Sequence, residues 1–425
     1  MELLMIADDF TGALDTGVKM AEYGMRTKVT TDVGADLSGR DGTEILVIDA
    51  ETRHLRAEEA GAVVKEIVKR AARQKIPYLY KKTDSALRGN VGAELTALLE
   101  GSGEKMLPFL PALPELGRVT VGGVHYIGDL PVAESIFGRD PFEPVRHSRV
   151  AELIGEQSGA PVHEIGAEEQ IPEGLCGICV FDSRSREELL WAGKSLCESG
   201  RLRISAGSAG FASVLPELLQ MERRETVRPH PEAKLLVLCG SVNPITKEQL
   251  RQGEEAGFRR IRLRPEEKLD PDFWTREEGL RVLERLRLRS AEEPWLMIDS
   301  NDAEGDRPAE ALARGRGMTR EELREGISRS MGEIFSALFT APETGTMLVT
   351  GGDTLLGCMR RLGVTELEPV CELYPGVVLS GFAYRGIRRH IITKSGGFGQ
   401  PSLLPDLKRD FLSGETERRG EEQEK

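Results

Sequence analysis

A cluster of oppositely charged side chains between residues 81 and 88 is the first feature of this sequence that could do chemistry. Lys81 and Lys82 end a short apolar stretch, and Thr83-Asp84-Ser85 and Arg88 follow before a helical pattern begins. Guanidinium groups bind carboxylates through paired hydrogen bonds, and carboxylates accept hydrogen bonds from hydroxyl groups. The cluster suits a small, anionic, hydroxylated molecule. A solvated turn with a surface salt bridge explains these residues equally well when they are taken alone.

Two further strand ends are expected to bring polar residues to the same place. Residues 3–7 (LLMIA) have the pattern of a buried strand and precede Asp8 and Asp9, and a strand at 44–49 precedes Arg53. The order strand, helix, strand predicts a parallel sheet, and ligands bind beyond the carboxyl ends of parallel strands. One helix N-cap needs only one aspartate, so the pair indicates more than capping. We therefore expect all these residues to converge at one edge of the sheet.

Residues 106–147 are rich in proline and glycine and show little periodicity, which predicts a long loop. Long loops inside compact domains are often functional. Arg118, His125 and Asp140 are candidates to complete the pocket, although the ordinary interpretation of each residue alone is structural.

Length and composition limit the classes of protein to consider. At 425 residues the chain is too long for one ordinary core, so we expect two domains. A net charge of -13 argues against a nucleic-acid partner, which needs a basic face. The N-terminus does not have the pattern of a signal peptide, and no apolar run approaches the roughly 20 residues that span a bilayer. Cys176 and Cys179 form the spacing of half a zinc site, but no second pair of cysteines follows, so we expect both to be strand residues and expect no metal site. The expected location is the reducing cytoplasm.

The second half of the chain predicts phosphate binding. After a polar stretch at 221–234, interpreted as a linker, strands are expected at 234–239, 347–350 and 391–393, and a glycine-rich turn follows each; a charged irregular loop is expected to begin at 301. Glycine lets phosphate oxygens approach backbone N–H groups at a helix N-terminus, where the helix dipole favours anions. Lys394 beside the last turn adds a point charge for a β- or γ-phosphate. The turns are Gly240-Ser241, Gly351-Gly352-Asp353-Thr354 and Gly396-Gly397-Phe398-Gly399.

Two common nucleotide motifs do not occur in the sequence. Gly193-Lys194-Ser195 imitates the end of a P-loop, but Glu188 stands where its first glycine should be, and the triplet lies in a helical pattern. The G-x-G-x-x-G fingerprint of dinucleotide-binding proteins is also absent, which disfavours an oxidoreductase.

Seven segments match the motifs of one family. They are IADDFTGALDTGV (6–18), ETRH (51–54), YKKTDSALRGNVGAEL (80–95), GRVTVGGVHYIGDLPVAES (117–135), GSVNPIT (240–246), VTGGDTLLG (349–357) and ITKSGGFG (392–399). With them the chain resembles the four-carbon acid sugar kinases, which phosphorylate threonate, erythronate or 2-oxo-tetronate with ATP. The segments span nearly the whole chain, and their combination and order are highly specific. Phe10 and Ser395 depart mildly from the leucine and alanine frequent in the family.

The resemblance implies a fold and a set of site residues. It implies an α/β protein of two domains, each with a mainly parallel sheet flanked by helices, and an active site in the interdomain cleft. We expect an acid-sugar-binding domain at 1–225, a nucleotide-binding domain at 226–405 and a charged tail at 406–425. The sugar acid would contact Asp9, Arg53, Lys82, Asp84, Ser85 and Arg88, and ATP would contact Ser241, Gly351, Gly352, Asp353, Thr354, Gly396 and Gly397.

The expected reaction is transfer of the γ-phosphate of ATP, with Mg²⁺, to the terminal C4 hydroxyl of the sugar acid. Asp84 or Asp9 would orient the hydroxyl or accept its proton, and Lys394 would neutralise the phosphates, with Asp353 as an indirect magnesium partner. Neither threonate, erythronate nor 2-oxo-tetronate is favoured, because no motif encodes stereochemistry. Alternatives are a kinase for another small polyhydroxy acid and a non-catalytic sensor of sugar acids or nucleotides. The expected partners are these small molecules, without nucleic acid or membrane, and a homodimer is the default assembly.

Overall fold

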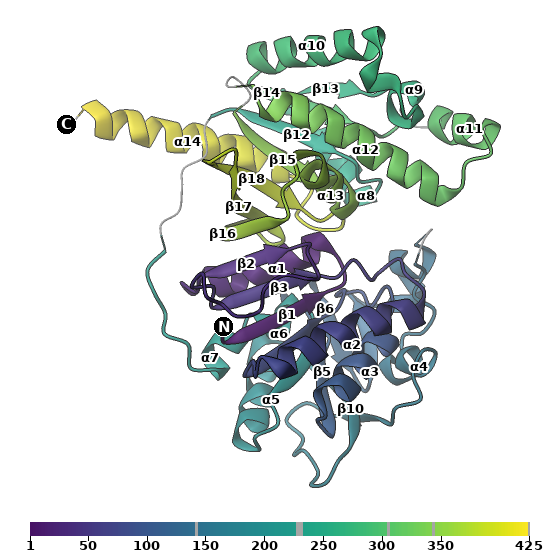
Figure 1. Ribbon diagram of the computed structural model, residues 1–425, viewed down its shortest axis with the longest axis vertical. Helices are drawn as coiled ribbons and strands as arrows, with labels where there is room; N and C mark the ends of the chain where they lie inside the picture. The colour runs from purple at the N-terminus through teal and green to yellow at the C-terminus, as the bar shows by residue number, and fades with distance from the viewer. Residues whose placement is uncertain (141–142, 227–232, 304–306, 342–344, 424–425) are drawn as a thin grey trace. The chain divides into compact units, whose positions relative to one another are not determined.

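The computed structural model describes residues 1–140, 143–226, 233–303, 307–341 and 345–423, with the side chains of 414–423 left aside. The chain forms two compact units, Met1–Thr226 (unit 1) and Val227–Lys425 (unit 2) (Figure 1). No helix in the described ranges combines the length and the apolar character that a membrane span requires.

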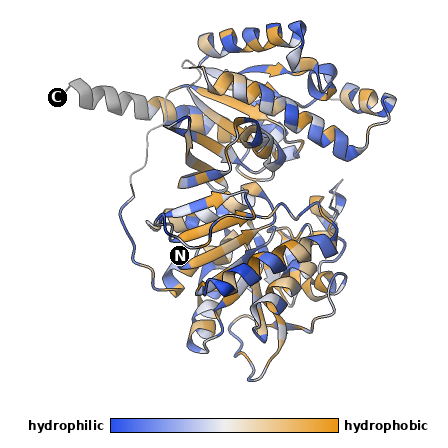
Figure 2. Ribbon diagram, in the orientation of Figure 1, coloured by the Kyte–Doolittle hydropathy of each residue, from blue (hydrophilic) through white to orange (hydrophobic). Residues whose placement is uncertain are grey.

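Unit 1 is built on a parallel sheet in which every neighbouring pair of strands is parallel. Its strands β1, β3, β5 and β10 are buried along their whole length, as expected for a sheet covered on both faces. Figure 2 shows these strands as mostly hydrophobic, while the helices around them carry hydrophilic stripes. The strand order is β2 (Thr27–Thr30), β3 (Ile45–Asp49), β1 (Leu3–Ala7), β4 (Tyr78–Lys82), β11 (Ile204–Gly207), β5 (Met106–Leu110), β10 (Gly177–Phe181) and β9 (Val162–Ile165).

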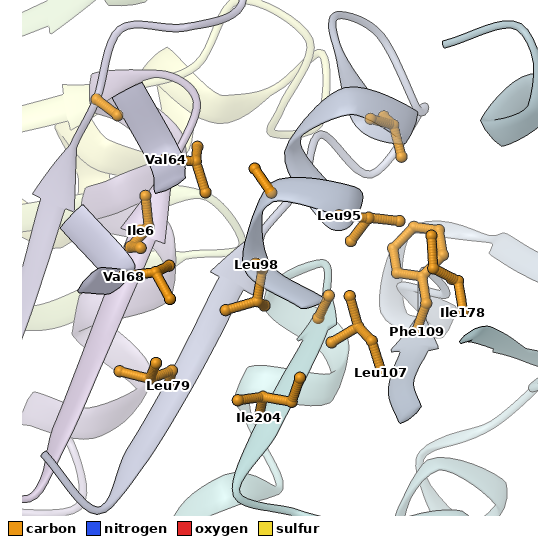
Figure 3. Packing of buried hydrophobic residues seen from close by; sticks show 14 of the residues in the cluster. Ile6, Val64, Val68, Leu79, Leu95, Leu98, Leu107, Phe109, Ile178 and Ile204 are labelled. Carbon is orange, nitrogen blue, oxygen red and sulfur yellow. The ribbon is translucent and has the colours of Figure 1, made fainter. Parts of the chain in front are cut away.

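The helices of unit 1 bury apolar stripes against this sheet. Val64 and Val68 of α2, one turn apart, and Leu95 and Leu98 of α3 pack on strand residues such as Ile6 in one core (Figure 3). Helices α1 and α6 pack together, as do α5 and α7. The helices are α1 (Phe10–Ala21), α2 (Ala57–Arg73), α3 (Val91–Ser102), α4 (Val150–Gly155), α5 (Arg186–Glu198), α6 (Ala209–Ala212) and α7 (Leu215–Leu218).

One prediction about unit 1 is wrong. Residues 106–147 are not one loop: they hold β5, the antiparallel sheet β6 (Arg118–Val121), β7 (Val124–Ile127) and β8 (Leu130–Pro131), and three short 3₁₀ turns. Gly122 and Gly123 both have positive φ in the turn between β6 and β7, and a two-residue Gly-Gly turn is a hairpin signal. Residues 204–207 form the strand β11 between β4 and β5, and the short α6 follows it.

Unit 2 holds a second sheet, parallel at one side and antiparallel at the other. Strands β13, β14, β12, β15 and β18 are parallel to one another, whereas β17 runs antiparallel to both β18 and β16. The strand order is β13 (Arg259–Arg262), β14 (Trp295–Asp299), β12 (Leu235–Cys239), β15 (Thr346–Thr350), β18 (Ile387–Lys394), β17 (Val377–Tyr384) and β16 (Glu366–Tyr374).

Helices of unit 2 pack on its sheet and on one another. Helices α8 and α14 contact each other and share a core with β12, while α12 and α13 approach closely at Gly332 and Gly357. The helices are α8 (Pro244–Glu255), α9 (Pro265–Leu269), α10 (Glu277–Glu292), α11 (Pro308–Gly315), α12 (Arg320–Phe339), α13 (Gly352–Leu362) and α14 (Leu403–Gln423).

Residues 301–303 lie outside helices and strands, in agreement with an irregular start to this charged segment, and α11 and α12 follow it. The N-cap of α12, Thr319, forms a capping box with Glu322. Helix α14 begins before the expected tail, and its Leu407 and Phe411 are buried because they lie on its sheet-facing side. Part of the expected linker, residues 227–232, lies outside the described residues.

The α/β fold class, with helices flanking mainly parallel sheets, is confirmed. The domain boundaries and the interdomain cleft remain predictions.

Candidate functional site

Arg53 gathers three carboxylates at the carboxyl ends of neighbouring strands in unit 1. Its Nε donates to Asp8 Oδ2 at 2.7 Å and its Nη2 to Asp9 Oδ1 at 2.6 Å, and Nη2 lies 3.8 Å from Asp84 Oδ1. The three partners follow β1 and β4, and Arg53 follows β3, so the parallel order of the strands produces the cluster. Asp9 is also the N-cap of α1, accepting from the Gly12 N–H at 3.2 Å. Capping and clustering therefore coexist in this residue.

Asp84 is held more tightly than the other carboxylates. Arg88 binds it with two bonds, Nε to Oδ2 at 2.9 Å and Nη2 to Oδ1 at 3.0 Å, and the Ala86 N–H donates to Oδ2 at 3.2 Å. Arg88 Nη1 reaches Asp140 Oδ2 at 3.3 Å. Residues 81–85 are all buried, so the alternative of a solvated turn does not hold.

The charges of this cluster control its protonation. Burial alone would raise the pKa of Asp84, but the nearby Arg88 and Arg53 outweigh it and hold the pKa well below its usual range. Burial likewise opposes ionisation of Asp8, and Arg53 and Lys81 bring its pKa below the ordinary value. Both groups are therefore carboxylates at neutral pH. Asp49 has a pKa raised well above its usual range, because burial and the nearby carboxylates of Glu51 and Asp9 disfavour its charged form.

The small sheet of β6–β8 grips the backbone and side chain of Ser85. Arg118 donates to the Ser85 hydroxyl, and His125 Nε2 lies 2.9 Å from the Ser85 carbonyl. Thr120 Oγ1 lies 3.0 Å from His125 Nδ1 on the other side of the ring. Burial lowers the pKa of His125 to about 4, so the imidazole is neutral and donates from Nε2 to the carbonyl. Arg118 and His125, which the sequence placed in a loop, therefore reach the site from the ordered hairpin of β6 and β7.

The two lysines of the opening cluster have different surroundings. Lys81 is fully buried and pairs with Glu94 Oε2 at 3.1 Å, and Glu94 also accepts from Thr52. Lys82 Nζ donates to the Thr83 carbonyl at 2.9 Å, and no carboxylate lies within salt-bridge distance of it in the described part of the chain. A buried ammonium without an anion is costly, so Lys82 suits the carboxylate of a ligand.

Three glycine turns come together in unit 2. A Cβ on Gly240 would overlap the Thr354 hydroxyl, and one on Gly396 would overlap the Ser241 hydroxyl. Gly351 has φ of +104°, and a Cβ there would lie 3.6 Å from the Ser241 nitrogen. Gly240 and Gly396 are required because another turn lies against each of them, whereas Gly351 is required by its positive φ. The N-termini of α8 and α13 start from two of these turns. The residues present fit a bound phosphate.

Lys394 lies beneath the last turn. It is 2% exposed, and its Nζ donates to Thr246 Oγ1 at 3.2 Å, the Ser395 carbonyl at 2.7 Å and the Gly396 carbonyl at 3.4 Å. All three acceptors are neutral, and burial lowers the lysine pKa to about 7. An anion above the turn would stabilise its charged form.

Asp353 and Gly397 belong to two of these turns but pack less tightly than Gly240 and Gly396, and a Cβ on Gly397 would lie 3.6 Å from Asn243 Nδ2, an ordinary contact. The Asp353 side chain is 45% exposed, and its carboxylate lies 3.3 Å from Arg324 Nη1. The Ser328 hydroxyl donates to the backbone carbonyl of Asp353. Mg²⁺ that travels with ATP needs only one or two protein carboxylates besides phosphates and water, and Asp353 is a carboxylate at these turns. The described residues contain no group of three potential metal ligands.

The sequence did not predict some residues that contact the Arg53 cluster and the glycine turns. Glu94 and Thr52 support Lys81, and Thr246 and Asn301 support the glycine turns. A polar residue at a predicted buried helix face, such as Glu94, was a usable signal. Asn301 gave no signal, because only the sheet order places it beside Ser241.

Comparisons with known proteins cover both units. A family model described as a sugar-binding N-terminal domain matches residues 3–215, and one described as a nucleotide-binding C-terminal domain matches residues 236–404. A D-threonate kinase of Salmonella typhimurium is 30% identical over 419 residues, 96% of this chain and 97% of the relative.

Other relatives at similar distance carry different names. A D-erythronate kinase of Heliobacterium modesticaldum is 25% identical, covering 93% of this chain and 94% of the relative. A 3-oxo-tetronate kinase of Methylobacterium radiotolerans is 27% identical, covering 93% and 95%. A solved structure from Salmonella typhimurium LT2 superposes with a TM-score of 0.77 at 22% identity, over 96% of this chain and 99% of that one. This last likeness concerns the fold.

Proposed function

Because the chain belongs to the four-carbon acid sugar kinase family, we propose that it transfers the γ-phosphate of ATP to the C4 hydroxyl of a tetronate. The observation that carries the proposal is the Arg53 cluster. At one edge of the unit 1 sheet, this cluster combines aspartates that can accept hydrogen bonds from hydroxyl groups with cationic side chains that suit a carboxylate. The glycine turns of unit 2 supply the complementary requirement, a cradle for phosphates.

In the proposed complex, cations of unit 1 recognise the acid end of the substrate. Lys82 is the best candidate for its carboxylate, because the arginines already bind aspartates. The aspartates accept hydrogen bonds from the substrate hydroxyls, and Ser85, held by Arg118 and His125, contributes a further polar contact.

Asp9 is the better candidate for the residue that orients the acceptor hydroxyl. Its side chain is 18% exposed, against 6% for Asp84, whose oxygens are occupied by Arg88 and whose pKa is held far below normal. Asp9 also accepts hydrogen bonds, from Arg53, Gly12 and Thr11, so the preference rests on its exposure and on the low pKa of Asp84, because a weak base accepts a proton poorly. In the step, the C4 oxygen bonds to the γ-phosphorus, the bond from that phosphorus to the β,γ-bridging oxygen breaks, and the hydroxyl proton passes to Asp9.

The nucleotide is held by the turns around Ser241, Gly351–Thr354 and Gly396-Gly397. Lys394 adds positive charge from beneath the last turn, so that backbone N–H groups and the ammonium together neutralise the phosphates. Mg²⁺ supplies further charge neutralisation when bound with ATP, and Asp353 would hold it through water.

The test is ADP release from the full-length protein with ATP and Mg²⁺ over a panel of acids. The panel contains D- and L-threonate, D- and L-erythronate, 2-oxo- and 3-oxo-tetronates, and longer aldonates as a control for chain length. Phosphorylation of at least one tetronate, with loss of activity in Arg53→Met, is the expected result. Binding of a tetronate without any ADP release would indicate a sensor, and silence across the panel would refute the proposal.

A further inference from the structure

Asn301, at the end of β14, reaches the glycine turn that follows the neighbouring strand β12. Its side chain is 5% exposed, and Nδ2 donates to the Ser241 carbonyl at 3.0 Å and to Asp299 Oδ1 at 2.8 Å. Both partners are acceptors, so the orientation of the amide is determined. The backbone N–H of Asn301 also donates to Asp299 Oδ1 at 2.9 Å.

A buried ion pair anchors this amide from behind. Asp299 is fully buried, and its Oδ2 accepts from Arg260 Nε at 3.0 Å and Nη2 at 2.6 Å. Arg260 in turn binds Glu254 of α8 at 2.7 Å. Breaking such a pair is expensive, so Asp299 presents a fixed acceptor on which Asn301 is oriented.

The hydrogen bond from Asn301 sets the orientation of one peptide group in the turn. In a trans peptide the carbonyl and the following N–H point in opposite directions. Holding the Ser241 carbonyl on Asn301 therefore turns the Val242 N–H away from Asn301. The Ser241 side chain meanwhile lies against Gly396, and its nitrogen lies near Gly351.

We infer that Asn301 is a positioning residue for nucleotide binding: it orients the Ser241–Val242 peptide so that N–H and hydroxyl donors of this turn face the phosphates. This gives a role to the first residue of a segment without any recognised motif. The inference rests on the proposed function only in requiring that unit 2 bind a nucleotide.

The test compares two substitutions that each remove one buried side-chain donor group in unit 2. Asn301→Ala removes the amide that donates to the Ser241 carbonyl. Ser330→Ala removes a hydroxyl that donates, at 2.9 Å, to the Lys268 carbonyl of α9 rather than to a glycine turn. We expect Asn301→Ala to weaken Mg·ADP binding by calorimetry about 10-fold and to raise KM for ATP similarly. The KM for the tetronate should stay within about two-fold, and Ser330→Ala should change neither constant beyond that limit. Asn301→Asp keeps the shape of the side chain and should weaken binding at least as much.

Equal effects of Asn301→Ala and Ser330→Ala on Mg·ADP binding would overturn the inference, as would unchanged binding in Asn301→Ala or loss of folding in both Asn301 variants. A wild-type protein that binds Mg·ADP but phosphorylates no tetronate would refute the proposed function and leave this inference open to the same binding test. A wild-type protein that binds no nucleotide would overturn both.

Discussion

Replacing Arg53 with methionine should destabilise unit 1 and raise the pKa of Asp8, which Arg53 holds low. The guanidinium has charge-assisted bonds of 2.7 and 2.6 Å to Asp8 and Asp9, and its side chain is 10% exposed. Methionine keeps much of the side-chain volume and removes the charge. Removing one partner of a buried pair leaves uncompensated charge and costs about 3–5 kcal/mol. For a unit of this size that corresponds to a Tm lower by roughly 6–20 °C.

The destabilisation should depend on pH in a defined direction. In the wild type the folded pKa of Asp8 is lowered, so its stabilising contribution is present above the unfolded pKa and is lost as pH falls through the folded value. Burial, the largest influence on the pKa of Asp8, acts in the opposite direction, and once Arg53 is gone only the charges of Lys81 and Lys82 oppose it. The folded pKa then rises, and the resulting penalty at pH 7 disappears as the carboxyl becomes protonated. The difference in Tm should therefore shrink between pH 7.5 and pH 5.

Scanning calorimetry at several pH values measures both effects. Lys65→Met is the matched control, because it removes an equivalent charge from a surface pair with Glu100 at 2.8 Å whose side chains are 41% and 56% exposed. It should cost less than about 1 kcal/mol. If Arg53→Met were as stable as Lys65→Met, or if its Tm deficit grew on acidification, the assignment of a buried, mutually dependent charge cluster would be wrong.

Four further outcomes are expected. Nucleotide binding should take up protons above pH 7 and weaken as pH rises, because phosphate restores the charge of Lys394, whose pKa lies at about 7; calorimetry at pH 8 in buffers of different ionisation enthalpy measures this, and buffer-independent heats would contradict it. Gly396→Ala should weaken Mg·ADP binding about 10-fold or more, since its Cβ meets the Ser241 hydroxyl, whereas Gly315→Ala, with nothing within 4 Å, should bind normally; equal affinities would show that the turns do not pack as described. Asp9→Asn should lower kcat by roughly 100-fold or more, while Asp84→Asn should act mainly on the KM for the tetronate; near-normal turnover in both would mean that neither is the base. His125→Leu should raise the KM for the tetronate and leave nucleotide binding unchanged, and its imidazole, with a pKa of about 4, should show no titration by NMR between pH 5.5 and 8.

Local sequence patterns predicted the strands that matter for the site, because each is a short apolar run that ends in polar or glycine residues. β1, β3 and β4 are buried along nearly their whole length, and the residues that follow them are Asp8-Asp9, Arg53 and Asp84. Parallel order alone then brings those strand ends to one edge. The glycine turns were predictable for the same reason.

The sequence alone therefore identifies the charged residues and glycines of the site and the sheet edge to which they belong. Tertiary structure decided which charges are already paired: Arg88 binds Asp84 and Lys81 binds Glu94, whereas Lys82 donates to a backbone carbonyl. It also decided the supporting contacts, such as the hairpin that holds Ser85 and the Asn301 amide beneath Ser241. These contacts join residues 40 and 60 positions apart, so no local pattern encodes them; they follow from the order of strands in the sheet.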